Sequence, residues 1–133
     1  MKEADGVLKR KSYGFAIRVV KLTQYLQDNY KDYALSRQVL RSGTSIGALV
    51  REAEFAQSKL DFINKLSIAL KEANETSYWL SLLYETNYID EKLFNSLQAD
   101  CKELIAILVS IVKTTKKNLL NDKENNNLNN KNK

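Results

Sequence analysis

Three glutamates are the residues of this chain that most resemble the ligands of a metal-dependent active site. Glu72 and Glu75 lie one helical turn apart in the segment Lys71–Trp79, and Glu52 is the obvious acid on the inward flank of the preceding segment. Paired carboxylates at this spacing recur in di-iron bundles, where a Glu-x-x-His motif completes the site. The chain has no histidine. We therefore favour a packing role for Glu72, Glu75 and Trp79 at a helix crossing, and an all-carboxylate metal enzyme stays open as the weakest alternative.

Nucleophilic catalysis has no better support. Serine, threonine and tyrosine are plentiful, but no histidine is present to activate one of them. Cys101, the single cysteine, falls on the apolar stripe of its segment, which indicates an inert core residue. A lone cysteine excludes an internal disulfide and is typical of a reducing cytosol. We expect a cytoplasmic protein that is not an enzyme and that holds no metal or cofactor.

The segment Leu40–Ala48 places two of the four glycines, Gly43 and Gly47, inside a pattern that otherwise predicts a helix. Each glycine within a helix costs about 1 kcal/mol relative to alanine. Because the two are four residues apart, they share one helical face and allow another backbone, or a ligand, to come very close. The segment lacks the Lys-Ser/Thr of a phosphate-binding P-loop and no strand precedes it. We favour a close helix–helix contact.

Basic side chains are the remaining candidates for function, in a chain with a net charge of +5. They could contact the phosphates of a nucleic acid, and Tyr13 and Tyr25 could stack on bases. A solvated charged face is the ordinary explanation for such a set, and Arg41 could instead pair with an acid of the next helix. The candidate nucleic-acid-binding residues are Lys9, Arg10, Lys11, Arg18, Lys21, Arg37, Arg41 and Arg51.

Four amphipathic segments must position these residues. Ser36 is the predicted N-cap of the second segment, and Ser58 with Asp61 resembles a capping box at the start of the third. Short links make neighbouring helices antiparallel, so we predict an all-α, up-down-up-down four-helix bundle. A basic lead (1–12) is expected to precede it, and a disordered tail rich in Asn and Lys (119–133) to follow it. The predicted helices cover residues 13–30, 37–57, 58–86 and 91–118.

The run Leu104–Val112 is apolar on nearly every helical face, although it is too short to span a bilayer. A helix that is apolar all round is buried on more than one side. In a four-helix bundle the second side can meet only another copy or a partner, unless the core is simply large. We favour a homo-oligomer whose interface contains Ile105, Leu108, Val109 and Val112.

Four stretches of the chain resemble one family of helical bundles, over about residues 8–118. Its members are often called 23S rRNA intervening-sequence proteins, and some are encoded within insertions in large-subunit rRNA genes. The resemblance implies a bacterial antiparallel bundle that assembles as a ring-shaped homopentamer. A related accessory protein of diversity-generating retroelements forms a basic pentameric barrel that binds nucleic acid and a reverse transcriptase. The stretches that carry the resemblance are Lys11–Tyr13, Phe15–Arg18, Leu40–Ala48 and Lys71–Thr76.

Two functional hypotheses follow for a protein of this kind. The first is a non-catalytic oligomeric scaffold that binds structured RNA or a ribonucleoprotein through phosphate contacts. Its partners would be copies of itself and an RNA, without a membrane. The alternative is a protein–protein interaction module in which the basic residues serve only solubility.

Overall fold

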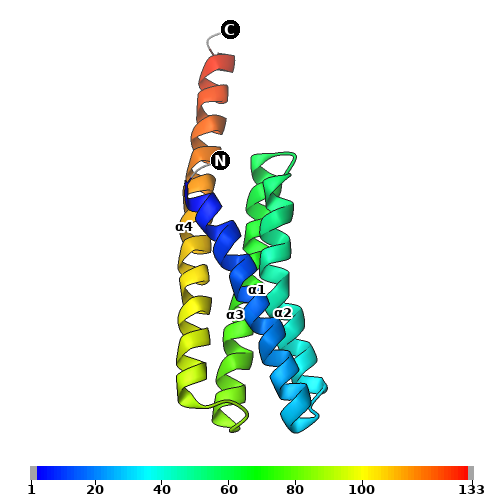
Figure 1. Cartoon of the computed structure of the whole chain (residues 1–133). Helices are drawn as coiled ribbons and strands as arrows, with labels where there is room; N and C mark the ends of the chain where they lie inside the picture. The colour runs from blue at the N-terminus through cyan, green and yellow to red at the C-terminus, as the bar shows by residue number, and fades with distance from the viewer. Residues whose placement is uncertain (1–2, 132–133) are drawn as a thin grey trace.

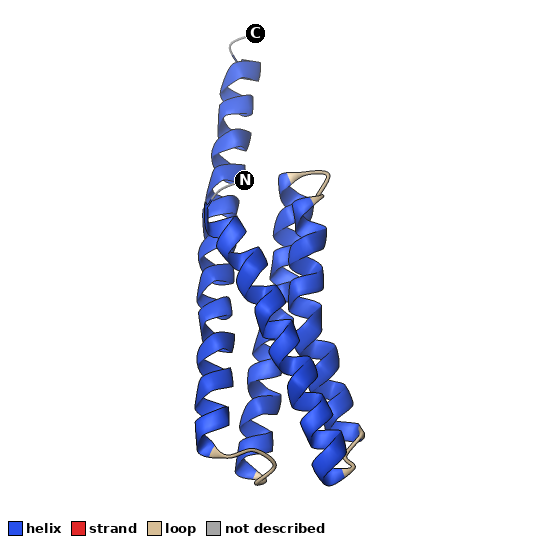
Figure 2. Ribbon diagram, in the orientation of Figure 1, coloured by secondary structure: helices blue, strands red, loops and turns tan. Residues whose placement is uncertain are grey.

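The computed structural model describes residues 3–131 as four helices joined by short loops (Figure 1). Successive helices run in opposite directions, and no strand is present in this part of the chain (Figure 2). The predicted all-α class and the antiparallel four-helix bundle are confirmed. The helices are α1 (Glu3–Tyr30), α2 (Ala34–Glu54), α3 (Lys59–Glu85) and α4 (Glu91–Lys131).

Side-chain caps set the starts of three helices. Ser58 accepts a hydrogen bond from the backbone N–H of Asp61 (3.0 Å), and Asp90 does the same for the N–H of Leu93 at the start of α4. The start of α2 differs from the prediction. There Asp32 accepts from the N–H of Leu35 (2.8 Å), so the helix begins earlier than expected and Ser36 is a buried residue inside it. Polar residues at helix starts are favoured because they satisfy N–H groups that have no partner within the helix.

The basic lead expected over residues 1–12 is helical from Glu3 onward. Leu8 and Ser12 are buried, at 2% and 1% exposure, and continue the stripe of Phe15 and Val19 by single helical turns. The buried stripe of α1 therefore begins closer to the N-terminus than we expected from the many charged residues in this segment.

The tail also differs from the expectation, because α4 continues to Lys131 and projects past the rest of the bundle (Figure 1). Residues 120–131 are exposed, so burial does not hold them in a helix. The chain has no proline, and none of its glycines lies beyond Gly47. Nothing therefore interrupts the backbone hydrogen bonds of α4. Lys59 of α3 pairs with Asp122 and ties the start of the extension to the bundle.

Helix α1 lies slantwise across the bundle rather than parallel to both of its neighbours (Figure 1). It packs extensively on α2 and meets α4 over a shorter region, where Lys11 pairs with Glu103 (2.7 Å) and Arg18 with Asp100 (2.6 Å). The core between the four helices is aliphatic, with Leu26, Ile46 and Leu80 fully buried. None of the helices within residues 3–131 has the length and apolarity needed to cross a membrane.

Candidate functional site: a cationic groove between α1 and α2

The two glycines of α2 lie against α1. A Cβ atom added to Gly43 would come within 2.7 and 2.8 Å of the Val19 methyl groups. One added to Gly47 would lie 3.3 Å from the backbone carbonyl oxygen of Ser12. The face opened by these glycines is therefore in contact with another helix of the same chain.

The hydroxyl groups around the glycines are also bonded within the chain. Thr44 donates to the carbonyl of Leu40 (2.6 Å), and the buried Thr76 of α3 donates to Ser42 (2.9 Å). Serine and threonine in helices commonly bond to carbonyls of the preceding turn, as Thr44 does. The Thr76–Ser42 bond ties α3 to α2, whereas the Thr44 bond stays within α2. These hydroxyls do not form a phosphate cradle.

The acidic residues considered for a metal site are all paired with basic side chains. Arg41 donates to Glu72 (3.1 Å) and pairs with Glu75, joining α2 to α3, whereas Glu52 lies 3.6 Å from Lys65. Within residues 3–131 no group of three or more His, Cys, Asp or Glu side chains is placed to hold a metal ion.

Trp79 and Cys101 both belong to the packed interior. Trp79 is half-buried and packs against the core, and its indole N–H has no hydrogen-bond partner among the described residues. The Cys101 thiol donates to the carbonyl of Ala73 (3.2 Å). Burial raises the pKa of this thiol to about 12, so it stays protonated at neutral pH and is a poor nucleophile.

Half of the predicted basic set is neutralised by acids on neighbouring helices. Lys9 pairs with Glu54 (3.0 Å), and Lys11, Arg18 and Arg41 have the partners given above. Such exposed pairs contribute little to stability, but they reduce the positive charge offered to an anion. The side chains of the set that form no ion pair with any described residue are Arg10, Lys21, Arg37 and Arg51.

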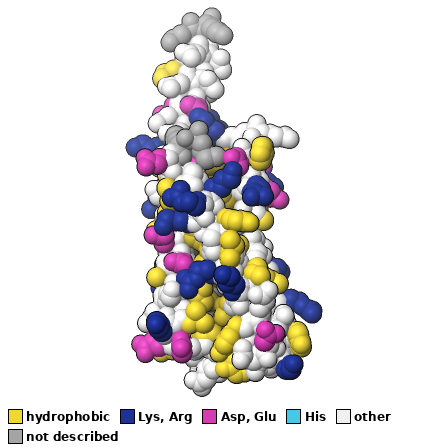
Figure 3. Space-filling view, viewed as in Figure 1, with side chains coloured by type: hydrophobic (Ala, Val, Ile, Leu, Met, Phe, Trp, Pro, Cys, Tyr) yellow, Lys and Arg dark blue, Asp and Glu magenta, His cyan; other side chains and the backbone are white. Residues whose placement is uncertain are grey.

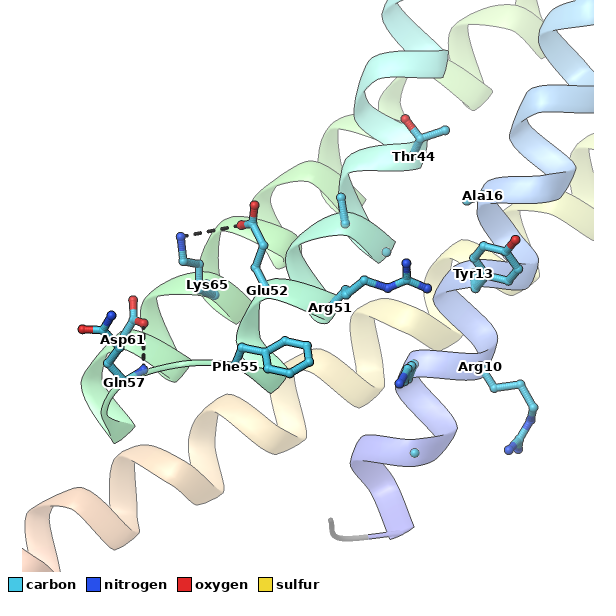
Figure 4. Close-up of a pocket in the computed structure, with 14 residues that line it drawn as sticks. Arg10, Tyr13, Ala16, Thr44, Arg51, Glu52, Phe55, Gln57, Asp61 and Lys65 are labelled. Atoms are coloured by element: carbon cyan, nitrogen blue, oxygen red, sulfur yellow. Dashed lines mark hydrogen bonds and ion pairs between the residues drawn. The ribbon is translucent and has the colours of Figure 1, made fainter.

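Two of these unpaired arginines line a groove of about 1040 Å³ between α1 and the end of α2. Arg51 and Phe55 extend toward α1, Tyr13 lies on the facing side, and Arg10 extends outward at the rim (Figure 4). Both aromatic side chains are solvent-exposed, Tyr13 at 61% and Phe55 at 77%. Exposed apolar side chains run down the middle of the face in Figure 3, with lysines and arginines gathered beside them. The site can therefore offer positive charge and aromatic faces together.

Small side chains keep the groove hollow. Its lining includes Gly6, Ala16, Gly47 and Ala48, so little side-chain volume fills the space between the larger residues. Helix α2 ends at Glu54, which places Phe55 at the turn that leads to α3. The sequence prediction extended this helix to residue 57, so it placed Phe55 inside the helix and missed it as a residue of the site. The sequence signal that could have identified Phe55 is that it is the one large apolar residue in the mostly polar stretch Arg51–Ser58.

Tyr25, the other tyrosine considered for stacking, lies away from this groove. It is one of a tyrosine cluster in which its ring centroid is 6.2 Å from that of Tyr30, and Tyr30 in turn lies 5.0 Å from Tyr88. Tyr25 therefore packs edge-on against a neighbouring tyrosine and does not add to the groove.

The residues predicted for an oligomer interface divide into two pairs. Leu108 and Val112 are buried in the core of the single chain, so the expectation that they face a second copy is wrong. They lie one helical turn apart on the side of α4 that faces the other helices. Ile105 and Val109 are only half-buried and remain available for a second contact.

Comparison with known proteins places the chain in a family. The family model described as 23S rRNA-intervening sequence protein matches residues 5–110. A crystal structure of a protein of unknown function from Bacteroides thetaiotaomicron, assigned to the S23 ribosomal protein family, is 55% identical with a TM-score of 0.81. That similarity covers 83% of this chain and 98% of the other. No curated protein matches significantly. The chain belongs to the 23S rRNA-intervening sequence protein family.

Proposed function

We propose that this protein is a non-catalytic cytoplasmic scaffold that binds structured RNA, or a ribonucleoprotein, through phosphate contacts at the α1–α2 groove. The observation that carries the proposal is the positive charge of Arg10 and Arg51, which line one groove and have no acidic partner among residues 3–131. Guanidinium groups suit phosphate oxygens because they bind them in a bidentate geometry. Lys21 and Arg37 lie outside the groove and add longer-range attraction.

Two further facts support RNA as the anionic partner. The description of the family, 23S rRNA-intervening sequence protein, names an RNA. The net charge of +5 favours association with a polyanion.

The scaffold is proposed to act as a homo-oligomer, and as a pentamer by the resemblance given above. Apolar side chains that a second copy would cover remain at the surface of α4, where Ile105 and Val109 are half-buried. Light scattering tests this part of the proposal. A pentamer mass at micromolar concentration is expected, and a monomer would contradict it.

Binding to RNA is tested by fluorescence anisotropy with a labelled rRNA hairpin at about 50 and about 200 mM salt. If about six phosphates are contacted, the affinity should fall roughly a thousandfold between the two conditions. Arg10→Gln and Arg51→Gln should each reduce the salt slope by about one. Lys71→Gln is the matched control, because Lys71 is an exposed side chain on α3 outside the groove. Absence of binding at the lower salt would contradict the proposal and direct the search to a protein partner.

A further inference from the structure

We infer that the α1–α2 groove receives an unpaired nucleotide of the RNA, with its base against Tyr13 and Phe55 and its phosphates at Arg51 and Arg10. This inference rests on the proposed function and names the part of an RNA that the site recognises. It distinguishes a loop, bulge or single strand from an uninterrupted duplex.

The first support is the exposure of two aromatic rings from different helices at one groove. Tyr13 and Phe55 are 61% and 77% exposed, and no described residue covers them. Aromatic faces stack on bases with little regard to sequence, because every base has a π-face. In a duplex the bases are already stacked on one another and their faces are unavailable, so such rings favour unpaired bases.

The second support is the arrangement of charge around the rings. Arg51 extends into the space between α1 and α2, and Arg10 lies at its rim (Figure 4). The lysines of the same lining are already engaged, Lys9 by Glu54 and Lys65 by Glu52. Asp61 also lines the groove, beside Gln57 and away from Arg10 (Figure 4), and its carboxylate accepts a hydrogen bond from the backbone N–H of Gln57 (3.2 Å). Arg51 and Arg10 hold the positive charge that is left for the phosphates on either side of a bound base.

The third support is space. The groove measures about 1040 Å³, and sites for small molecules typically measure about 300 to 1,000 Å³. Ala16 and Ala48 line it without filling it. A nucleotide therefore has room there, and a larger side chain at Ala48 would take that room away.

The experiment compares two labelled RNAs with the same stem, one carrying an unpaired bulge and one fully paired. Tyr13→Leu and Phe55→Leu keep an apolar side chain but remove the π-face. Each is expected to weaken binding of the bulged RNA roughly 5- to 100-fold without changing its salt slope. Binding of the paired RNA should stay the same. Phe55→Tyr should retain the wild-type affinity.

Filling the groove provides a second variant that removes neither a ring nor a charge. Ala48→Leu should weaken binding of the bulged RNA selectively, whereas Ala99→Leu, at an exposed alanine on α4, should not. A fluorescent adenine analogue at the bulge should be quenched by the wild-type protein and not by the Tyr13→Leu, Phe55→Leu double variant.

Three outcomes would overturn the inference. Equal losses for the two RNAs would mean that the rings do not recognise an unpaired base. Unchanged affinity of all the groove variants, with RNA still bound, would place the RNA elsewhere and leave the proposed scaffold intact. A change of oligomer mass in Tyr13→Leu or Phe55→Leu, measured by light scattering, would assign the rings to a contact between copies. Failure of the wild-type protein to bind either RNA at low salt would instead contradict the proposed function itself.

Discussion

The contact between α1 and α2 has a closed side and an open side, and adjacent residues build both. Ser12 is 1% exposed and its carbonyl oxygen lies against Gly47, whereas the next residue, Tyr13, is 61% exposed at the groove. On α2, Gly43 is buried against Val19, and Arg51 lies at the open side. The closed side uses residues without side chains to bring two backbones together. The open side places charge and aromatic rings where that contact ends, so one pair of helices supplies both stability and the proposed binding surface.

The largest effect is expected when the closed side is forced apart. Gly43→Leu would push a side chain into the Val19 methyl groups, which a single Cβ would already approach to 2.7 Å. Because Val19 is fully buried, we expect a loss of about 3 kcal/mol in the free energy of unfolding. Urea denaturation followed by circular dichroism measures it.

The matched control for that variant is Gly14→Leu. Gly14 is an exposed helical glycine, and a Cβ added there would have nothing within 4 Å. If the two leucine variants unfold at the same urea concentration, the closeness of α1 and α2 at Gly43 does not contribute to stability.

A smaller effect of opposite sign is expected at the same exposed glycine when alanine replaces it. Gly14→Ala should stabilise the protein by about 0.5 to 1 kcal/mol, because alanine favours the helix and meets no neighbour. Gly43→Ala should destabilise it. Melting temperatures of the two alanine variants decide the point, and a gain at both positions would mean that neither glycine is required for packing.

The smallest effect is expected for Arg41, which pairs with acids of α3 rather than facing the groove. Arg41→Gln should cost about 0.5 kcal/mol and less at high salt, because the ion pairs with Glu72 and Glu75 are partly exposed. Its RNA affinity should stay within error of the wild type in the anisotropy titration. A loss as large as that of Arg51→Gln would move the binding surface from the groove to the α2–α3 side.

The bundle could be predicted from the sequence because its signals are local. Apolar stripes with a helical period and the capping pair Ser58 and Asp61 are read within a few residues of one another. Helix ends were less predictable. The burial of Leu8, and with it the early start of α1, depends on how α1 packs against the other helices. The start of α2 depends on whether Asp32 or Ser36 caps the helix, and Asp32 does.

The site could be predicted only in part, because it depends on contacts between distant residues. The sequence shows Lys9 and Arg10 as equivalent neighbours. Only the fold brings Glu54 to Lys9 and leaves Arg10 without an acid among residues 3–131. Phe55 was missed for a related reason, since its exposure follows from where α2 ends.

The most direct test of the central claim is photochemical cross-linking of the wild-type protein to a bulged RNA that carries a photoreactive uridine at the unpaired position. Mass spectrometry of the digested complex then identifies the attached residue. Attachment to peptides that contain Tyr13 or Phe55 is the result that the account predicts. Attachment confined to α4 or to the tyrosine cluster around Tyr30 would contradict it.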